Sequence, residues 1–280
     1  RTLDPVLTTL AHGYCANHFV ADKLFPTVQV NRSHGKIPMF DKSEFLSRKT
    51  ERAKSALSNR IPVEEHTYID FQTVERDIEV AIDYLDEMEL NHIYKYEQRT
   101  VQRLQDILLL DKELIAADLA TNTSYYSADA QMALSQGNDF SSALDPIEFL
   151  QQGKEAVREQ IGVYPNTLIL SDKAYLGLKS NPSLLDKIKY SGINKIATGI
   201  ISELTDITNI HIAQAQKADL DGIFADVWDN CAVLAYVDYR TKETRSAFNP
   251  SFGYCMQIEG MPEVDSYTEN GGKIKVIRNT

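Results

Sequence analysis

The chain has 280 residues, of which 43% are hydrophobic and 25% charged, and a net charge of −11 at pH 7. This length and composition suit a folded protein with one large domain or two smaller ones. No stretch approaches the roughly 20 apolar residues that cross a bilayer, so we expect no membrane span. The overall acidity argues against a general nucleic-acid binder, which normally carries a basic excess or patch.

The sequence contains no recognisable catalytic or metal-binding motif. Phosphate-binding GxxxxGK, GxSxG, HExxH and CxxC patterns are all missing. The nearest calcium candidate is Asp219-Leu220-Asp221-Gly222, but an EF-hand would need acidic residues where the chain has Lys217 and Trp228. The odd number of widely separated cysteines favours reduced, mostly buried thiols in a cytoplasmic product; they are Cys15, Cys231 and Cys255. We therefore expect no catalytic residue, no cofactor and no metal.

The first 30 residues have modest hydrophobicity, and residues 31–66 have little to bury. A helical patch at Val6–Val20 leads into a short extended piece, Phe25–Val30. Residues 31–66 are basic, rich in Ser, Arg and Lys, and interrupted by Gly and Pro. This composition predicts either a flexible loop or a two-stranded arm.

Positive charge is concentrated in this segment. Between Val30 and Arg60 the chain has eight Lys and Arg against three Asp and Glu, a net +5, so the remainder carries −16. Three interpretations stay open: an arm that contacts another subunit, a plain solvated loop, or a nucleic-acid contact. The arm is favoured because a basic segment is attracted to the acidic body of a neighbour, whereas base stacking would have only Phe40 and Phe45. The intersubunit contacts that we expect are made by Arg48, Lys49, Arg52 and Lys54.

The region from Val63 to Gln136 contains neither Gly nor Pro. Alternating residues at His66–Ile82 predict a β-strand. From about Leu85 to Asn122, apolar residues recur at three-, four- or seven-residue steps, which predicts one helix. At 1.5 Å per residue that helix would be roughly 50 Å long, about the width of a whole domain.

The second half of the chain alternates helices and buried strands. Asp145-Pro146 begins a helix that continues to about Gln160. An apolar strand and two short helices follow, and further strands close the sequence; the expected elements are Tyr164–Ser171, Ser171–Lys179, Ser183–Tyr190, 210–213, 232–237, 254–258 and 273–277. The pattern predicts an α+β protein. An α/β layer at 160–240 is joined to a second unit in which the first strand, the long helix and the last strands meet.

Four stretches together resemble the major capsid proteins of tailed double-stranded DNA phages, which have the Hong Kong 97-like shell fold. They are the arm ending in Phe25-Pro26-Thr27-Val28-Gln29-Val30, the charged loop at 31–66, the helix at 85–122, and the segment from Tyr164 through Asn181-Pro182 to Ile188-Lys189-Tyr190. The tail around Phe252-Gly253-Tyr254 and Glu269-Asn270-Gly271-Gly272 is similar to the closing strands of that family. The order of these motifs carries the likeness, which covers nearly the whole chain.

The resemblance implies a subunit divided into five parts. These are an N-terminal arm at 1–30, an extended loop at 31–66, a peripheral domain at 67–145 with the spine helix at 85–122, an axial domain at 146–240, and a return to the peripheral domain at 241–280. It implies a virion protein that assembles in the bacterial host cytoplasm and has no catalysis of its own. Its copies would form pentamers and hexamers of an icosahedral shell around DNA, contacted non-specifically.

The same resemblance implies scaffolding and portal proteins as partners, and it allows decoration proteins. One alternative shares the fold: an encapsulin-type nanocompartment that encloses an enzyme instead of DNA. A soluble α/β enzyme is an alternative of another class, but it would need a Gly-rich loop after Leu170, where the chain has Ser171-Asp172-Lys173-Ala174. A different phage structural component, such as a capsid-stabilising or tail protein, is the weakest of the alternatives.

Overall fold

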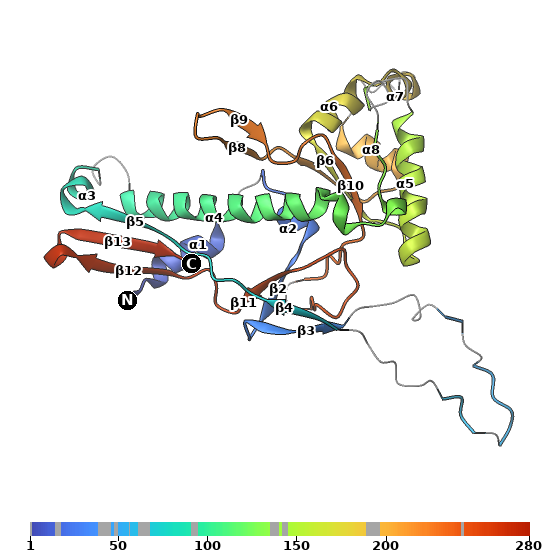
Figure 1. Cartoon of the computed structure of the whole chain (residues 1–280), viewed down its shortest axis with the longest axis horizontal. Helices are drawn as coiled ribbons and strands as arrows, with labels where there is room; N and C mark the ends of the chain where they lie inside the picture. The colour runs from blue at the N-terminus through green and yellow to red at the C-terminus, as the bar shows by residue number, and fades with distance from the viewer. Residues whose placement is uncertain are drawn as a thin grey trace.

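A 26-residue helix, α4 (Tyr96–Thr121), is the axis around which the rest of the protein is arranged (Figure 1). It is about 40 Å long at 1.5 Å per residue. The structure is a computed structural model, and it describes residues 2–14, 18–38, 46–47, 50–55, 57–60, 68–90, 95–134, 140–141, 145–188, 197–241 and 244–280.

The prediction of one continuous helix over 85–122 was wrong. The structure has a separate helix, α3 (Tyr84–Leu90), before α4, and Lys95 has a non-helical backbone with φ −71° and ψ 87°. Residues 91–94 of the predicted helix lie outside the described part. The end of a sheet fixes the start of α3, because the Tyr84 N–H donates to the carbonyl of Lys273 at 3.0 Å. Apolar spacing continues through this region of the sequence, so periodicity alone could not show the break.

An antiparallel sheet lies beside the first half of α4. Its strands follow the order β1 (Thr2–Leu3), β12 (Val264–Glu269), β13 (Ile274–Asn279) and β5 (Ile78–Asp83). Helix α1 (Pro5–Gly13) packs with α4 against this sheet. The buried side chains of this core are Leu7, Ala11, Ile82, Val101, Leu104, Val264 and Ile277. The strand that ends at Asp83, the long helix and the last strands therefore meet in one core, as predicted. The burial of Leu7 and Ala11 in this core, and strand β12 itself, were not predicted.

An α/β unit packs at the other end of α4. Its sheet has the order β10 (Ala232–Ala235), β6 (Thr167–Ser171) and β7 (Asn209–Ala213), with β6 antiparallel to β10 and parallel to β7. All five residues of β6 are buried. Four helices surround the sheet: α5 (Pro146–Ile161), α6 (Asp172–Ser180), α7 (Pro182–Ile188) and α8 (Thr198–Thr205). The elements predicted here are confirmed with slightly different ends, and α8 is an addition.

The predicted strand at His66–Ile82 is two strands that belong to different sheets. Strand β4 (Tyr68–Gln72) pairs with β3 (His34–Pro38), whereas β5 pairs with β13. His66 and Thr67 are not among the described residues. The N–H of Thr73 donates to the carbonyl of Ser33 at 2.7 Å and ends the first pairing. Alternation continues across the junction, so no pattern in the sequence marks the change of partner.

The remaining elements are short. Helix α2 (Ala21–Leu24) precedes β2 (Thr27–Val30), which runs parallel to β11 (Cys255–Ile258). Strands β8 (Gln216–Ala218) and β9 (Phe224–Asp226) form an antiparallel hairpin. The predicted helical patch at Val6–Val20 is therefore too long, whereas the extended piece before Val30 is confirmed. Short 3-10 turns occupy Thr123–Tyr125, Ala128–Ala130 and Asn270–Gly272.

The start of α5 yields a stability prediction. Asp145 caps this helix by accepting a hydrogen bond from the Ile147 N–H at 3.1 Å, and its other oxygen lies 2.5 Å from Lys187 Nζ. The hydrogen bond from Lys187 lowers the pKa of the Asp145 carboxyl. We expect Asp145→Ala to lower the free energy of unfolding by about 1 kcal/mol, while Asp145→Asn, which keeps a capping oxygen, loses less.

Urea unfolding of the unassembled subunit at several pH values measures both effects. Because the pKa of Asp145 is lower in the folded state, its ion pair stabilises the fold above the ordinary pKa of 3.8. That contribution is lost as the pH falls through the lowered value. The difference between wild type and Asp145→Asn should therefore shrink in acid, and a difference that stays constant with pH would contradict this assignment.

Candidate assembly interface

A buried carboxylate joins three separate parts of the chain. Glu113 lies in the second half of α4 and has no exposed surface. Its oxygens accept hydrogen bonds from the Val20 N–H at 3.0 and 3.1 Å, from the Ala21 N–H at 2.8 Å and from Trp228 Nε1 at 2.7 Å. The first two donors belong to the N-terminal segment at the start of α2, and the indole follows β9.

The side chains around Glu113 form an apolar cluster between α4 and the α/β unit. Three alanines of α4 pack there and allow a close approach of the neighbouring backbone; they are Ala116, Ala117 and Ala120. They meet Leu24 from α2 and Ile169 from β6. Because the cluster draws on all three elements, the N-terminal segment is fixed to the helix and to the α/β unit at one place.

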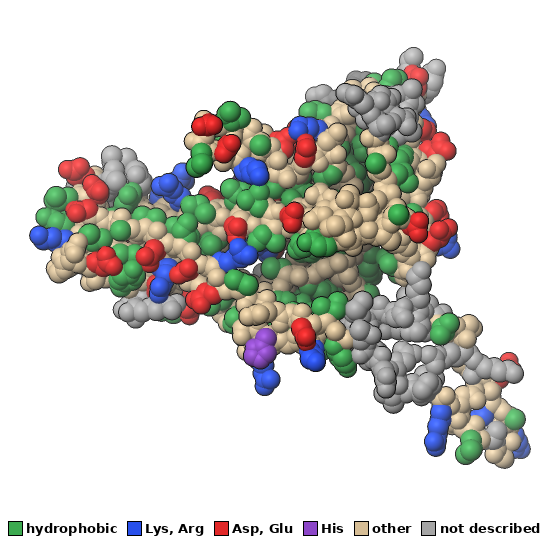
Figure 2. Space-filling view, viewed as in Figure 1, with side chains coloured by type: hydrophobic (Ala, Val, Ile, Leu, Met, Phe, Trp, Pro, Cys, Tyr) green, Lys and Arg blue, Asp and Glu red, His purple; other side chains and the backbone are tan. Residues whose placement is uncertain are grey.

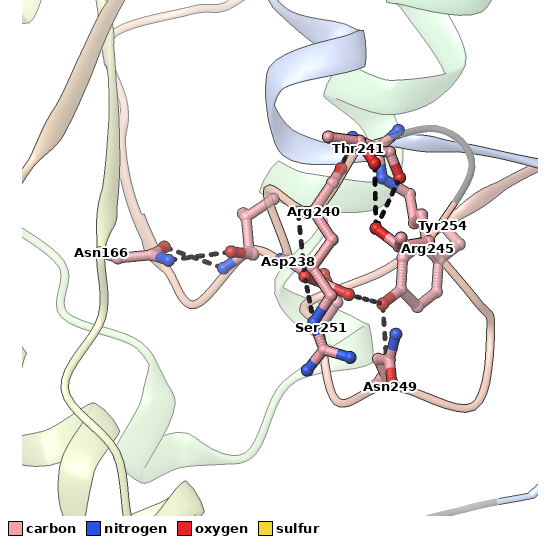
Figure 3. Close-up of polar contacts among 10 residues, drawn as sticks. Asn166, Asp238, Arg240, Thr241, Arg245, Asn249, Ser251 and Tyr254 are labelled. Carbon is pink, nitrogen blue, oxygen red and sulfur yellow. Dashed lines mark hydrogen bonds and ion pairs between the residues drawn. The ribbon is translucent and has the colours of Figure 1, made fainter.

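A polar network holds the chain where it leaves the α/β unit (Figure 3). Asn166 donates from Nδ2 to the carbonyl of Val237 at 2.8 Å and accepts from the Val237 N–H at 2.9 Å. Arg245 donates to the carbonyl of Thr27 at 3.1 Å and to that of Arg240 at 2.9 Å. These contacts connect the returning chain to β6 and to β2.

The buried Asp238 and the partly buried Tyr254 belong to the same network. The Tyr254 hydroxyl donates to the carbonyl of Asn249 at 2.9 Å and lies 3.3 Å from an Asp238 oxygen. Burial, and then the Asp238 charge, raise the pKa of Tyr254 to about 12. The phenol therefore stays protonated at neutral pH and acts as a hydrogen-bond donor, which suits a fixed connection between elements.

Two of the four predicted contact residues, Arg52 and Lys54, lie on a projecting segment. Strands β3 and β4 form the base of an arm, and the described residues between them extend away from the body (Figure 1). Arg52 and Lys54 are exposed on this arm, while Arg48 and Lys49 lie outside the described residues. Leu57 is also exposed there, at 90%. The contact of these four basic residues with another subunit stays a prediction.

The described residues contain no group of three His, Cys, Asp or Glu side chains that could hold a metal. Asp219 and Gly222 form the tip of the β8–β9 hairpin, where Gly222 has φ +77°.

Cys231 and Cys255 are free and partly buried, and Cys15 is not described. Burial raises the pKa of Cys231 to about 11, so its thiol is protonated and a poor nucleophile at neutral pH. Among the residues that the structure describes, no helix is long and apolar enough to cross a bilayer.

Similarity to known proteins identifies the class of protein that this structure represents. No family model matches the sequence. A solved structure of a phage-related protein from Bordetella bronchiseptica RB50 has a TM-score of 0.81 and 28% identity, covering all of this chain and 91% of that one. The capsid structure of cyanophage P-SCSP1u has a TM-score of 0.54 at 11% identity, over 95% and 84% of the two chains, and supports the fold alone. Both agree with a Hong Kong 97-like capsid fold.

Sequence similarity narrows this class to one family. The chain is 39% identical over 282 residues to the major capsid protein of Burkholderia phage BcepMu, covering all of this chain and 91% of that protein. The chain belongs to the phage major capsid proteins. It therefore forms the head shell from many copies of itself and is located in the virion. The predicted family, the α+β fold and the capsid function are confirmed.

The Glu113 junction was not predicted from the sequence, and it can be tested directly. Glu113→Gln keeps the size of the side chain but points an N–H₂ group at N–H donors, which leaves a buried donor without an acceptor. We expect the free energy of unfolding of the unassembled subunit to fall by roughly 1–3 kcal/mol in urea titrations. Trp228 is the only tryptophan, so its fluorescence reports on this junction and should shift to the red.

Trp228→Phe is the matched control, followed by circular dichroism. It removes one donor but leaves Glu113 with the Val20 and Ala21 N–H groups, so we expect a smaller loss of stability than for Glu113→Gln. Equal stability of Glu113→Gln and wild type would show that the carboxylate does not hold these elements together.

Proposed function

We propose that this capsid protein assembles as pentamers and hexamers into an icosahedral head that encloses phage double-stranded DNA, and that it has no catalysis of its own. The observation that carries the proposal is the 39% identity, over the whole chain, to the major capsid protein of a phage. Negative charge dominates the chain, so DNA would be held by enclosure and weak non-specific contact. The alternative with the same fold is an encapsulin-type shell, which would enclose an enzyme instead of DNA.

We also propose a division of the subunit into five parts. Residues 1–30 would be the N-terminal arm and 31–66 the extended loop. The peripheral domain would combine 67–145 with 241–280, and the axial domain would be 146–240. Support comes from the separate hydrophobic cores at the two ends of α4 and from the pairing of early strands with late ones.

We further propose that assembly takes place in the host cytoplasm with scaffolding and portal proteins, and that decoration proteins can bind the finished shell. The extended loop would lie across a neighbouring subunit. Its ordering entropy is not offset by a core of its own, because the described residues 50–55 and 57–60 are exposed. Contact with an acidic neighbour would supply that missing stabilisation.

Electron microscopy of the purified full chain tests the proposed function. We expect negative-stain images to show closed polyhedral particles, and particles from infected or induced cells to contain DNA and a portal vertex. A small monodisperse species, or particles filled with an enzyme, would contradict the proposal.

Charge reversal on the loop tests the proposed contacts. We expect Arg48→Glu, Lys49→Glu, Arg52→Glu and Lys54→Glu in one chain to lower the yield of sedimenting particles at least tenfold, because each new carboxylate would then be repelled by the acidic neighbour that attracts the basic side chain of the wild type. The circular dichroism spectrum of the subunit should not change. The same four positions changed to Arg or Lys, with charge kept, should assemble normally; normal particles from the reversed variant would refute the assignment.

A further inference from the structure

The β8–β9 hairpin projects from the α/β unit as a well-defined turn. Its strands pair from Gln216 with Asp226 to Ala218 with Phe224. At the tip the Asp219 N–H donates to the carbonyl of Ile223 at 2.9 Å, and the Gly222 N–H donates to that of Asp219 at 2.9 Å. Gly222 adopts φ +77°, which an L side chain rarely tolerates. The tip thus has one conformation set by hydrogen bonds.

The base of the hairpin is attached firmly to the rest of the subunit. Lys173, in α6, forms ion pairs with Asp226 at 3.3 Å and with Asp229 at 2.9 Å. The Val227 N–H donates to the carbonyl of Ala215 at 2.9 Å, and the next residue is the buried Trp228 of the Glu113 junction. The direction in which the hairpin points is therefore fixed by the core of the subunit.

Large apolar side chains cover this projection. Leu220 is fully exposed, and Ile223 and Phe224 are 68% and 69% exposed. A single exposed leucine is ordinary in a folded protein, but three large apolar residues within five positions on a rigid projection are typical of a contact surface. Asp219 and Asp221 stand beside them and are exposed as well, so the tip is both apolar and acidic (Figure 2).

The arm on the opposite side of α4 has the complementary chemistry. Among its exposed residues are Leu57, at 90%, and the basic side chains Lys54 and Arg60. Figure 1 shows the hairpin on one side of α4 and the arm leaving from the other. Two different, complementary surfaces on opposite sides of a subunit are what a head-to-tail ring of identical copies requires.

We propose that the β8–β9 hairpin of one subunit is the docking site for the basic arm of a second copy of this chain, within the shell. Leu220 packs against the arm around Leu57, and Asp219 and Asp221 pair with Lys54 and Arg60. This inference rests on the proposed loop contact and deepens it by naming the acceptor surface. Lys217, on the same hairpin, limits how close further basic residues of the arm can lie.

A charge exchange tests the pairing in the full chain. We expect Asp219→Lys with Asp221→Lys, and separately Lys54→Glu with Arg60→Glu, each to reduce sedimenting particles at least tenfold. Combining all four changes should restore the yield to within about threefold of wild type. The proposal is wrong if the hairpin variant assembles normally, or if the combined variant assembles no better than either pair. Particles formed by the wild type would still support the proposed shell in that case.

A matched control separates specific pairing from bulk charge. Glu159→Lys with Asp186→Lys makes the same change in net charge on exposed positions of α5 and α7. Added to the arm reversal, it should not restore assembly. Rescue by this pair would mean that net charge alone controls assembly, and it would overturn the assignment of the hairpin.

A cysteine pair tests proximity independently of charge. Both Leu57 and Leu220 are highly exposed, so replacing them leaves the core untouched. We expect particles of the Leu57→Cys, Leu220→Cys chain to form covalent dimers and higher multimers on mild oxidation, resolved on a non-reducing gel. Each single variant carries the same natural cysteines and should not form these covalent multimers. Equal crosslinking in the single and double variants would contradict docking of the arm on the hairpin.

Discussion

The structure depends on a carboxylate that is buried without a cation beside it in the described residues. The Glu113 carboxyl group loses its hydration on folding, and that loss is tolerated only when hydrogen-bond donors replace the water. The Val20 and Ala21 N–H groups and the Trp228 indole fill this role together. If any one of the three elements moves away, the buried oxygens of Glu113 are left with fewer donors. The N-terminal segment, α4 and the loop before β10 are therefore held in place as one group.

This junction explains why one helix can organise two separate cores. The first half of α4 buries Val101 and Leu104 against the sheet of the terminal strands, while its second half carries Glu113 and the alanines that meet the α/β unit. Both ends of the chain return to this helix. Two of the parts that project outside these cores are the β3–β4 arm and the β8–β9 hairpin. These parts carry exposed large apolar side chains, including Leu57 and Leu220.

Local patterns in the sequence predicted most of the elements, and non-local contacts account for the failures. Asp145-Pro146 and Ser171-Asp172 marked the starts of α5 and α6 correctly, because capping depends on a few neighbouring residues. The division of 66–82 was missed because it depends on a partner, Ser33, that is far away in the sequence. The break before Tyr96 was missed because apolar spacing continues across it. Strand β12 was missed for a related reason: its Asp265 is buried and paired with Arg278, so the strand does not alternate cleanly.

The same distinction applies to the assembly surfaces. The basic character of the arm is visible in the sequence because charge is a property of composition. Glu113 was invisible because a single acidic residue in an amphipathic helix ordinarily faces water, and only its three distant donors show otherwise. The sequence at 219–222 indicated a solvated turn more than a calcium loop and did not predict a contact surface, because the exposure of Leu220, Ile223 and Phe224 follows from the direction in which Lys173 and Trp228 hold the hairpin. Composition can thus identify a segment that needs a partner. The fold is needed to identify the rigid, oppositely charged surface that a second copy presents to it.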